Sequence, residues 1–214
     1  MQKKQYNIKG GLYLVVDPSM PLDNLINKIE SALKGGVDVL QIWNHWLGES
    51  DKLVIIKAIV ALGHQFGVPV MINDNIDLFV VTELDGIHFD NIPENFEELK
   101  LHLKPNAIIG LTCGNEFDKI QWAIDHELDY ISFCSVFPSS SVNTCDLVDK
   151  AIIYKTRAST KMPIFLSGGI NLENINDLKD TQMNGIAVVS GIMSANDPEE
   201  KSRQYKQALK NEII

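Results

Sequence analysis

Residues 162–192 read MPIFLSGGINLENINDLKDTQMNGIAVVSGI, and this stretch contains two short apolar runs on either side of a polar segment. Val, Ile, Leu and Phe dominate both runs, 162–168 and 185–191, without strict alternation. Such runs are typical of parallel strands that are covered on both faces. The segment 171–180 between them predicts a helix with Asn171 as its cap. The stretch therefore predicts one strand–helix–strand unit.

The same alternation recurs along the whole chain. Six further apolar runs lie at 11–17, 37–43, 68–72, 85–89, 107–112 and 129–133. Amphipathic stretches between and after them predict helices, among them 21–36, 49–67, 115–128 and 197–211, the last with Asp197 as its cap. Eight such units in 214 residues predict an α/β fold, a single (β/α)8 TIM barrel domain over 1–214. A doubly wound open sheet fits less well, because no glycine-rich loop follows the first run.

Composition excludes several classes of function. The chain is 45% hydrophobic with a formal net charge of -9, and Lys and Arg form no basic stripe, so we expect neither nucleic-acid nor membrane partners. No apolar stretch reaches the roughly 18–20 residues that span a bilayer, and no signal peptide is visible. The three cysteines, Cys113, Cys134 and Cys145, have no metal-binding spacing. These features predict a cytoplasmic protein with reduced cysteines.

Glycines follow the last two apolar runs, where this fold commonly binds phosphate. Gly168 and Gly169 permit close approach of the backbone, and the amides around Val189, Ser190 and Gly191 can donate to phosphate oxygens. In the alternative interpretation these glycines only turn the chain. Two such loops at neighbouring strand ends favour a phosphate site.

Polar residues follow two other runs. Asn73 and Asp74 offer an amide for orientation and a carboxylate for a hard cation such as Mg2+, although Asp74 could instead cap the next helix. The loop FPSSSVNTCD, 137–146, places hydroxyls near the expected phosphate site or simply forms a polar surface. These hydroxyls belong to Ser139, Ser140 and Ser141. His88 lies within an apolar run, where a core histidine is the commoner outcome.

The ordered set GLYLVVD, GG-V-x-x-x-Q, GVPVMINDNID, DGIH, IIGLT, DYISFCSVFPS, SGGI and GIAVVSGI followed by DP resembles the thiamine phosphate synthase family, which includes thiazole tautomerases. The resemblance covers almost the whole chain and implies a TIM barrel transferase of thiamine biosynthesis with small-molecule phosphate substrates. In that family hydroxymethylpyrimidine diphosphate loses pyrophosphate, and thiazole phosphate attacks the resulting cation. Mg2+ and fixed cationic side chains stabilise the departing pyrophosphate.

The resemblance carries site residues onto this chain. It implies that Asp74 is the first metal carboxylate of an Mg2+ site. The second falls on Pro93, and Asp90 or Glu94 lies near enough to substitute. The substrate-binding residues that it implies are Gln41, Asn73, Thr112, Ser139, Ser141, Gly169, Val189 and Ser190, and Ser140 is a further candidate from the same loop.

The diphosphate side departs from the family pattern at residues 41–46, QIWNHW. Trp43 stands at the family's arginine, while His45 and Val142 stand at its two lysines. Each charge-assisted hydrogen bond of this kind contributes on the order of 1.5–3 kcal/mol, so losing two or three would slow the chemistry by several orders of magnitude. His45 restores part of the charge at most, because histidine is mostly neutral near pH 7.

Three hypotheses follow. The chain is a synthase with an altered diphosphate clamp, in which Trp43 and His45 contact substrate. Alternatively it is a tautomerase-like enzyme, although the catalytic histidine of that branch falls on Gly114 and His45 would have to act as acid and base. In the third, it is a non-catalytic sensor in which Trp43 and Trp46 stack on a heteroaromatic ring. Soluble barrels of this kind are usually homodimers, and we expect the same here.

Overall fold

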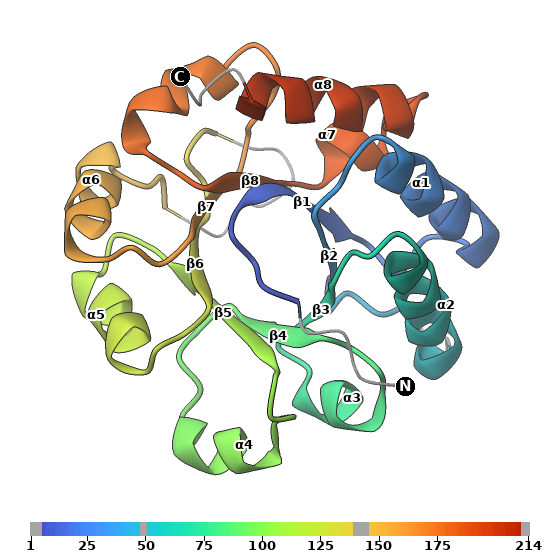
Figure 1. The fold of residues 1–214 in the computed structure, drawn as a ribbon, viewed down its shortest axis with the longest axis horizontal. Coiled ribbons are helices and arrows are strands. Elements are labelled where there is room, and N and C mark those ends of the chain that lie inside the picture. The colour runs from blue at the N-terminus through green and yellow to red at the C-terminus, as the bar shows by residue number, and fades with distance from the viewer. Residues whose placement is uncertain (1–5, 48–50, 139–145, 211–214) are drawn as a thin grey trace.

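The computed structural model describes residues 6–47, 51–138 and 146–210, which form a closed barrel of parallel strands in the order β1 to β8 (Figure 1). Pairing of β1 with β8 places Gly11 opposite Gly185 and closes the sheet. The (β/α)8 prediction is confirmed, and the open-sheet alternative is wrong. The strands are β1 Gly11–Val16, β2 Val39–Ile42, β3 Val70–Asn73, β4 Gly86–Phe89, β5 Ile108–Cys113, β6 Tyr130–Phe133, β7 Ile164–Ser167 and β8 Gly185–Val188.

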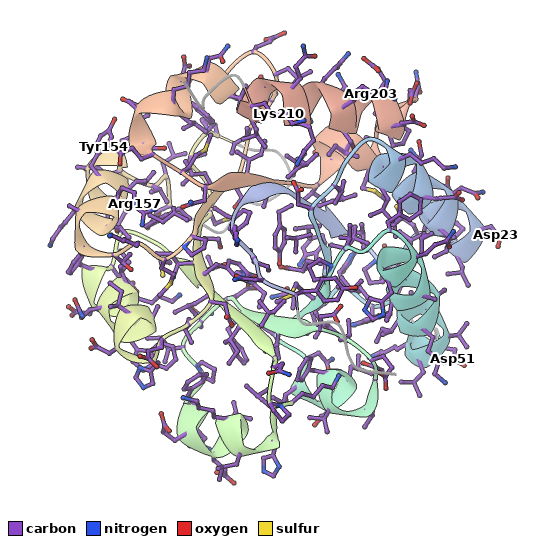
Figure 2. The ribbon with its side chains drawn as sticks, viewed as in Figure 1. Asp23, Asp51, Tyr154, Arg157, Arg203 and Lys210 are labelled. Carbon is purple, nitrogen blue, oxygen red and sulfur yellow. The ribbon has the colours of Figure 1, made fainter. Side chains whose placement is uncertain are left out.

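Helices surround the barrel (Figure 1). Figure 2 shows the charged side chains of Asp23, Asp51 and Arg203 on the outer rim of these helices. No helix within the described ranges is long and apolar enough to cross a membrane. The helices are α1 Leu22–Lys34, α2 Lys52–Gln65, α3 Ile76–Val81, α4 Phe96–His102, α5 Phe117–Asp125, α6 Lys150–Ser159, the 3-10 helix η1 Ile175–Thr181, α7 Ser190–Met193 and α8 Pro198–Lys210.

The segment 171–180 differs from its prediction. Asn171 does cap a turn, because its side chain accepts hydrogen bonds from the backbone N–H groups of Glu173 and Asn174. The helix that follows is a 3-10 helix that starts only at Ile175. Asn174 in turn accepts from the Asn171 N–H, so asparagine side chains replace the backbone bonds of a regular helix. At α8 the predicted cap is confirmed, since Asp197 accepts from the Glu200 N–H.

A layer of large side chains fills the interior of the barrel. Gly110 makes room for it, because a Cβ there would lie 2.1 Å from the Tyr130 ring. This layer forms a floor beneath the carboxyl ends of the strands, and its tyrosine hydroxyls take part in the site above it. Its buried residues are Ile8, Tyr13, Val39, Met71, Ile108, Tyr130 and Phe165.

Candidate active site

A cavity of about 910 Å3 opens at the carboxyl ends of the strands, and residues of all eight strands contribute to its wall. This is the end of the barrel at which the fold places its active sites. The structure therefore brings most of the predicted site residues into one cavity. Those that line it are Gln41, Trp43, Asn73, Asp90, Thr112, Gly169, Val189 and Ser190.

Other predicted residues are placed differently. Among the described residues, His45, Asp74 and Glu94 lie outside the cavity lining. Trp46 also lies outside it, packs against the hydrophobic core and donates its ring N–H to Asn44. The hydroxyls predicted on Ser139, Ser140 and Ser141, and the departure at Val142, fall outside the described residues.

The glycine loop after β7 has the backbone that only glycine adopts easily. Gly168 and Gly169 have φ angles of +88° and +66°. A Cβ at Gly168 would lie 2.4 Å from the Ser135 nitrogen, and one at Gly169 would lie 2.5 Å from the Pro138 oxygen. The glycines therefore both turn the chain and let its backbone form the cavity wall. The phosphate site at these glycines stays a prediction.

Asp74 connects β3 to β4 and does not cap a helix. Its carboxylate accepts the backbone N–H of Asp90 at 3.0 Å and an amide hydrogen of Asn73 at 3.2 Å. The cap of α3 is Asn75, which accepts from the Leu78 N–H, so the capping alternative for Asp74 is wrong.

The carboxyls of Asp74 and Asp90 lie close together beside the cavity. Partial burial, together with repulsion from Asp90, raises the pKa of Asp74 to about 6. The described part of the chain contains no group of three or more His, Cys, Asp or Glu side chains arranged to hold a metal ion. A cation at this edge would therefore depend on this carboxylate pair and neighbouring neutral oxygens.

A chain of buried hydrogen bonds runs across the barrel floor into the site. The Tyr13 hydroxyl lies 2.6 Å from Gln41 Oε1 and 2.8 Å from the Tyr130 hydroxyl. Tyr130 lies 2.9 Å from His88 Nδ1. Because an amide oxygen only accepts, Tyr13 donates to Gln41, Tyr130 donates to Tyr13, and His88 donates Nδ1–H to Tyr130. The amide oxygen of Gln41 thus fixes the direction of every bond.

The chain continues on the other side of His88. Burial lowers the pKa of this histidine to about 4, so its ring is neutral at pH 7 and Nε2 carries no proton. Nε2 therefore accepts from Thr112 Oγ1 at 2.8 Å, and Thr112 accepts from Ser132 Oγ at 3.2 Å. Both hydroxyl protons are used inside the network, which leaves lone pairs for donors of a ligand. His88 is a buried residue, as expected, but it also lines the cavity.

Trp43 and His45 lie at the mouth of the barrel. Trp43 lines the cavity, and its ring lies 5.1 Å from that of His45. His45 Nδ1 is 3.1 Å from both carboxylate oxygens of Asp17, and the His45 side chain is 46% exposed. Partial burial raises the pKa of Asp17, but hydrogen bonds from Ser19 and His45 lower it more, so the pKa lies below its usual value. The pair orients the imidazole outside the cavity lining.

Sequence reasoning missed Tyr13, Tyr130, Ser132 and Lys119 as site residues, all of which line the cavity. Tyr13 lies two residues before Val15, and Ser132 two before Cys134, so alternate positions of each strand face inward. This alternation along the strands could have identified Tyr13, Tyr130 and Ser132 from the sequence. Lys119 lies on α5, and no motif marks it.

The comparisons with known proteins agree with this geometry. The family described as thiamine monophosphate synthase matches residues 12–192. The chain belongs to this family. The thiamine-phosphate synthase of Aromatoleum aromaticum is 29% identical over 196 residues, which cover 92% of this chain and 94% of that protein. That of Picrophilus torridus is 30% identical over 204 residues, which cover 94% of this chain and 97% of that protein.

Solved structures share the fold. The thiamine phosphate pyrophosphorylase of Pyrococcus furiosus has a TM-score of 0.83 at 24% identity, and the match covers 96% of this chain and 98% of that one. At this level of identity the likeness shows the barrel alone. The family resemblance predicted from the ordered motifs is confirmed by the family match.

Proposed function

We propose that this protein is a transferase of thiamine biosynthesis that joins hydroxymethylpyrimidine diphosphate to thiazole phosphate and releases pyrophosphate. The observation that carries the proposal is the cavity at the carboxyl ends of the strands, in which the glycine loops of β7 and β8 face the polar ends of β2 to β5. Relatives that cover nearly the whole chain and are named thiamine-phosphate synthase support it.

The thiazole phosphate would bind at the glycine loops. Gly169, Val189 and Ser190 line the cavity at the ends of β7 and β8, where backbone N–H groups can donate to phosphate oxygens. We expect Ser139, Ser140 and Ser141 to add hydroxyl contacts from the neighbouring loop. One substrate would then bind on the β7–β8 side of the cavity.

The pyrimidine would bind between Gln41 and Thr112. The amide oxygen of Gln41 already accepts from Tyr13, so its N–H groups remain for a ring nitrogen of the ligand. Thr112 uses its proton on His88 and can accept from an amino group. A donor and an acceptor that face one cavity from β2 and β5 suit an aminopyrimidine, which offers a ring nitrogen and an amino group.

Asp74 and Asp90 fit an Mg2+ site, because oxygen ligands and two mutually repelling carboxylates suit a hard cation. Asp90 lines the cavity and its backbone N–H donates to Asp74, so Asp90 is a stronger candidate than Glu94 for the second carboxylate. When bound, the ion would supply positive charge to the departing pyrophosphate. Asn73, which donates to Asp74, would orient that carboxylate.

The chain's own residues would then orient the reaction. The carbon–oxygen bond to the diphosphate breaks with its electron pair on pyrophosphate, and the thiazole nitrogen forms the new bond to that carbon. Trp43 would cover the pyrimidine ring at the mouth of the cavity. His45, held by Asp17, would position Trp43 through their ring contact and take no part in bond making.

Thiamine phosphate formation from the two substrates and Mg2+, followed by mass spectrometry, tests the proposal. We expect product with the unmodified protein, loss of product in Asp74→Ala, and full activity in Asp77→Asn, an exposed change on α3. Binding of thiazole phosphate without any product would refute the synthase proposal. It would favour the tautomerase or sensor alternatives.

A further inference from the structure

Lys119 is a buried cation on the wall of the cavity. It belongs to α5, is 9% exposed, and is the one lysine or arginine among the described residues that is buried. Its Nζ donates to the backbone oxygen of Asp90 at 2.8 Å and to Asn91 Oδ1 at 3.2 Å. Within the described ranges it is also the one lysine or arginine that lines the cavity.

This charge has no anionic partner in the described part of the chain. None of the ion pairs there includes Lys119, and both of its hydrogen-bond acceptors are neutral oxygens. An ammonium group has three N–H donors, so one remains after these two bonds. Buried charges in proteins are normally paired. The arrangement therefore provides charge and a donor for an anion that enters the cavity.

Two other lysines show what a purely structural role looks like in this barrel. Lys28 donates to the backbone oxygens of Met193 and Ala195, and Lys104 donates to those of Thr82 and Leu84. Both are partly exposed and neither lines the cavity. Lys119 shares their bonding to a loop but differs in burial and in facing the site.

The position of Lys119 in the barrel indicates which anionic group of the substrates it would bind. In the closed strand order β4 lies across the barrel from β8, so Lys119, which bonds to the loop after β4, lies opposite the loop after β8. It lies instead beside Asp90, next to the carboxylate pair. We propose that Lys119 is the fixed cation that binds the diphosphate of the pyrimidine substrate and the pyrophosphate released from it. This inference rests on the proposed function.

Lys119 would thus supply charge that the residues after β2 lack. Trp43 and His45 provide no permanent cation at the mouth of the site. A lysine from α5 can reach the same cavity because all strand ends converge there. The ligand class that this geometry favours is a diphosphate, with the monophosphate held across the cavity by backbone groups.

Calorimetric titration of inorganic pyrophosphate in the presence of Mg2+ tests the role. Lys119→Gln keeps N–H donors for the two neutral oxygens but removes the charge, and Lys104→Gln is the matched control outside the cavity. We expect pyrophosphate affinity to fall roughly 10- to 100-fold in Lys119→Gln, with thiazole phosphate affinity within about threefold of the unmodified protein. Lys104→Gln should leave both affinities unchanged.

A measurement on the unmodified protein covers the case in which Lys119→Gln does not fold. The Lys119 ammonium signal in NMR spectra, assigned by its loss in Lys119→Arg, should shift on adding pyrophosphate and not on adding thiazole phosphate. Pyrophosphate affinity in Lys119→Gln within twofold of the unmodified protein, or an ammonium signal that ignores pyrophosphate, overturns the inference.

The inference and the proposed function fail in different ways. Pyrophosphate binding that depends on Lys119, in a protein that forms no thiamine phosphate, would keep the anion site and reject the reaction. Product formation with pyrophosphate binding that is indifferent to Lys119→Gln would keep the reaction and reject the role of Lys119.

Discussion

Protonation of His88 should destabilise the fold in mild acid. Burial, with a smaller contribution from the charge of Lys119, lowers the pKa of His88 from 6.5 to about 4, while Asp90 opposes the shift. Well above pH 6.5 the ring is neutral in both folded and unfolded chains, so it adds no pH dependence there. Below that pH the unfolded chain takes up the proton first, and stability falls until the folded pKa is reached.

The two pKa values set the magnitude. A shift from 6.5 to about 4 corresponds to a loss of about 2 kcal/mol of unfolding free energy between pH 7 and pH 4.5. Asp74 titrates in the same range with the opposite sign, because its folded pKa is raised. We therefore compare the free energy of unfolding of the unmodified protein with that of His88→Gln. Both proteins contain Asp74, so its contribution cancels in the difference.

Urea denaturation at half-unit intervals from pH 7.5 to pH 4.5 measures that difference. At pH 7 the unmodified protein should be the more stable, because glutamine does not reproduce both hydrogen bonds of the ring. Its advantage over His88→Gln should shrink by about 2 kcal/mol as the pH falls to 4.5. A difference in stability that stays constant across this range would refute the neutral, buried histidine and the bond directions derived from it.

Three further changes test other parts of the site. Tyr130→Phe leaves the buried His88 Nδ1–H without an acceptor and should cost about 1–3 kcal/mol by urea denaturation. Gly168→Ala forces an alanine to a φ of +88° and should lower stability by about 1–3 kcal/mol or more, whereas Gly114→Ala, which meets nothing within 4 Å, should melt like the unmodified protein. Asp74→Asn removes a carboxyl whose pKa is raised in the folded protein. The variant should therefore be more stable than the unmodified protein above pH 6 and lose that advantage below pH 4. It should also form no product.

Much of the fold was predictable because the short strands are largely apolar, and stretches such as 21–36 and 115–128 repeat their apolar residues at helical spacing. The exception is informative. Residues 171–180 have an acceptable helical pattern, but the side chains of Asn171 and Asn174 bond to the local backbone. These side-chain bonds compete with the backbone bonds of a regular helix. They depend on side-chain rotamers, which cannot be inferred from the spacing of hydrophobic residues.

The candidate site was predictable where chemistry lies directly at the end of a strand. Gln41, Asn73 and Thr112 are such residues, and they line the cavity. The role of Asp74 was ambiguous because an Asn follows it, and only the tertiary contact with Asp90 decides between cap and cross-strand acceptor. The floor tyrosines read as ordinary core residues, since nothing in a single strand shows which hydroxyls meet across the barrel.

The charge of Lys119 acts both on the proposed diphosphate site and on His88 in the hydrogen-bonded floor. A departing diphosphate requires positive charge nearby, but it does not require that the charge come from one particular strand, so a motif search around residues 41–46 overlooks a lysine on α5. The same charge also helps keep His88 neutral. Lys119→Gln should therefore raise the pKa of His88 as well as weaken pyrophosphate binding, and an NMR titration of the His88 ring measures this shift. A pKa of His88 that is unchanged or lower in Lys119→Gln would show that the ammonium does not act on the hydrogen-bonded floor, because removal of a nearby positive charge can only favour protonation.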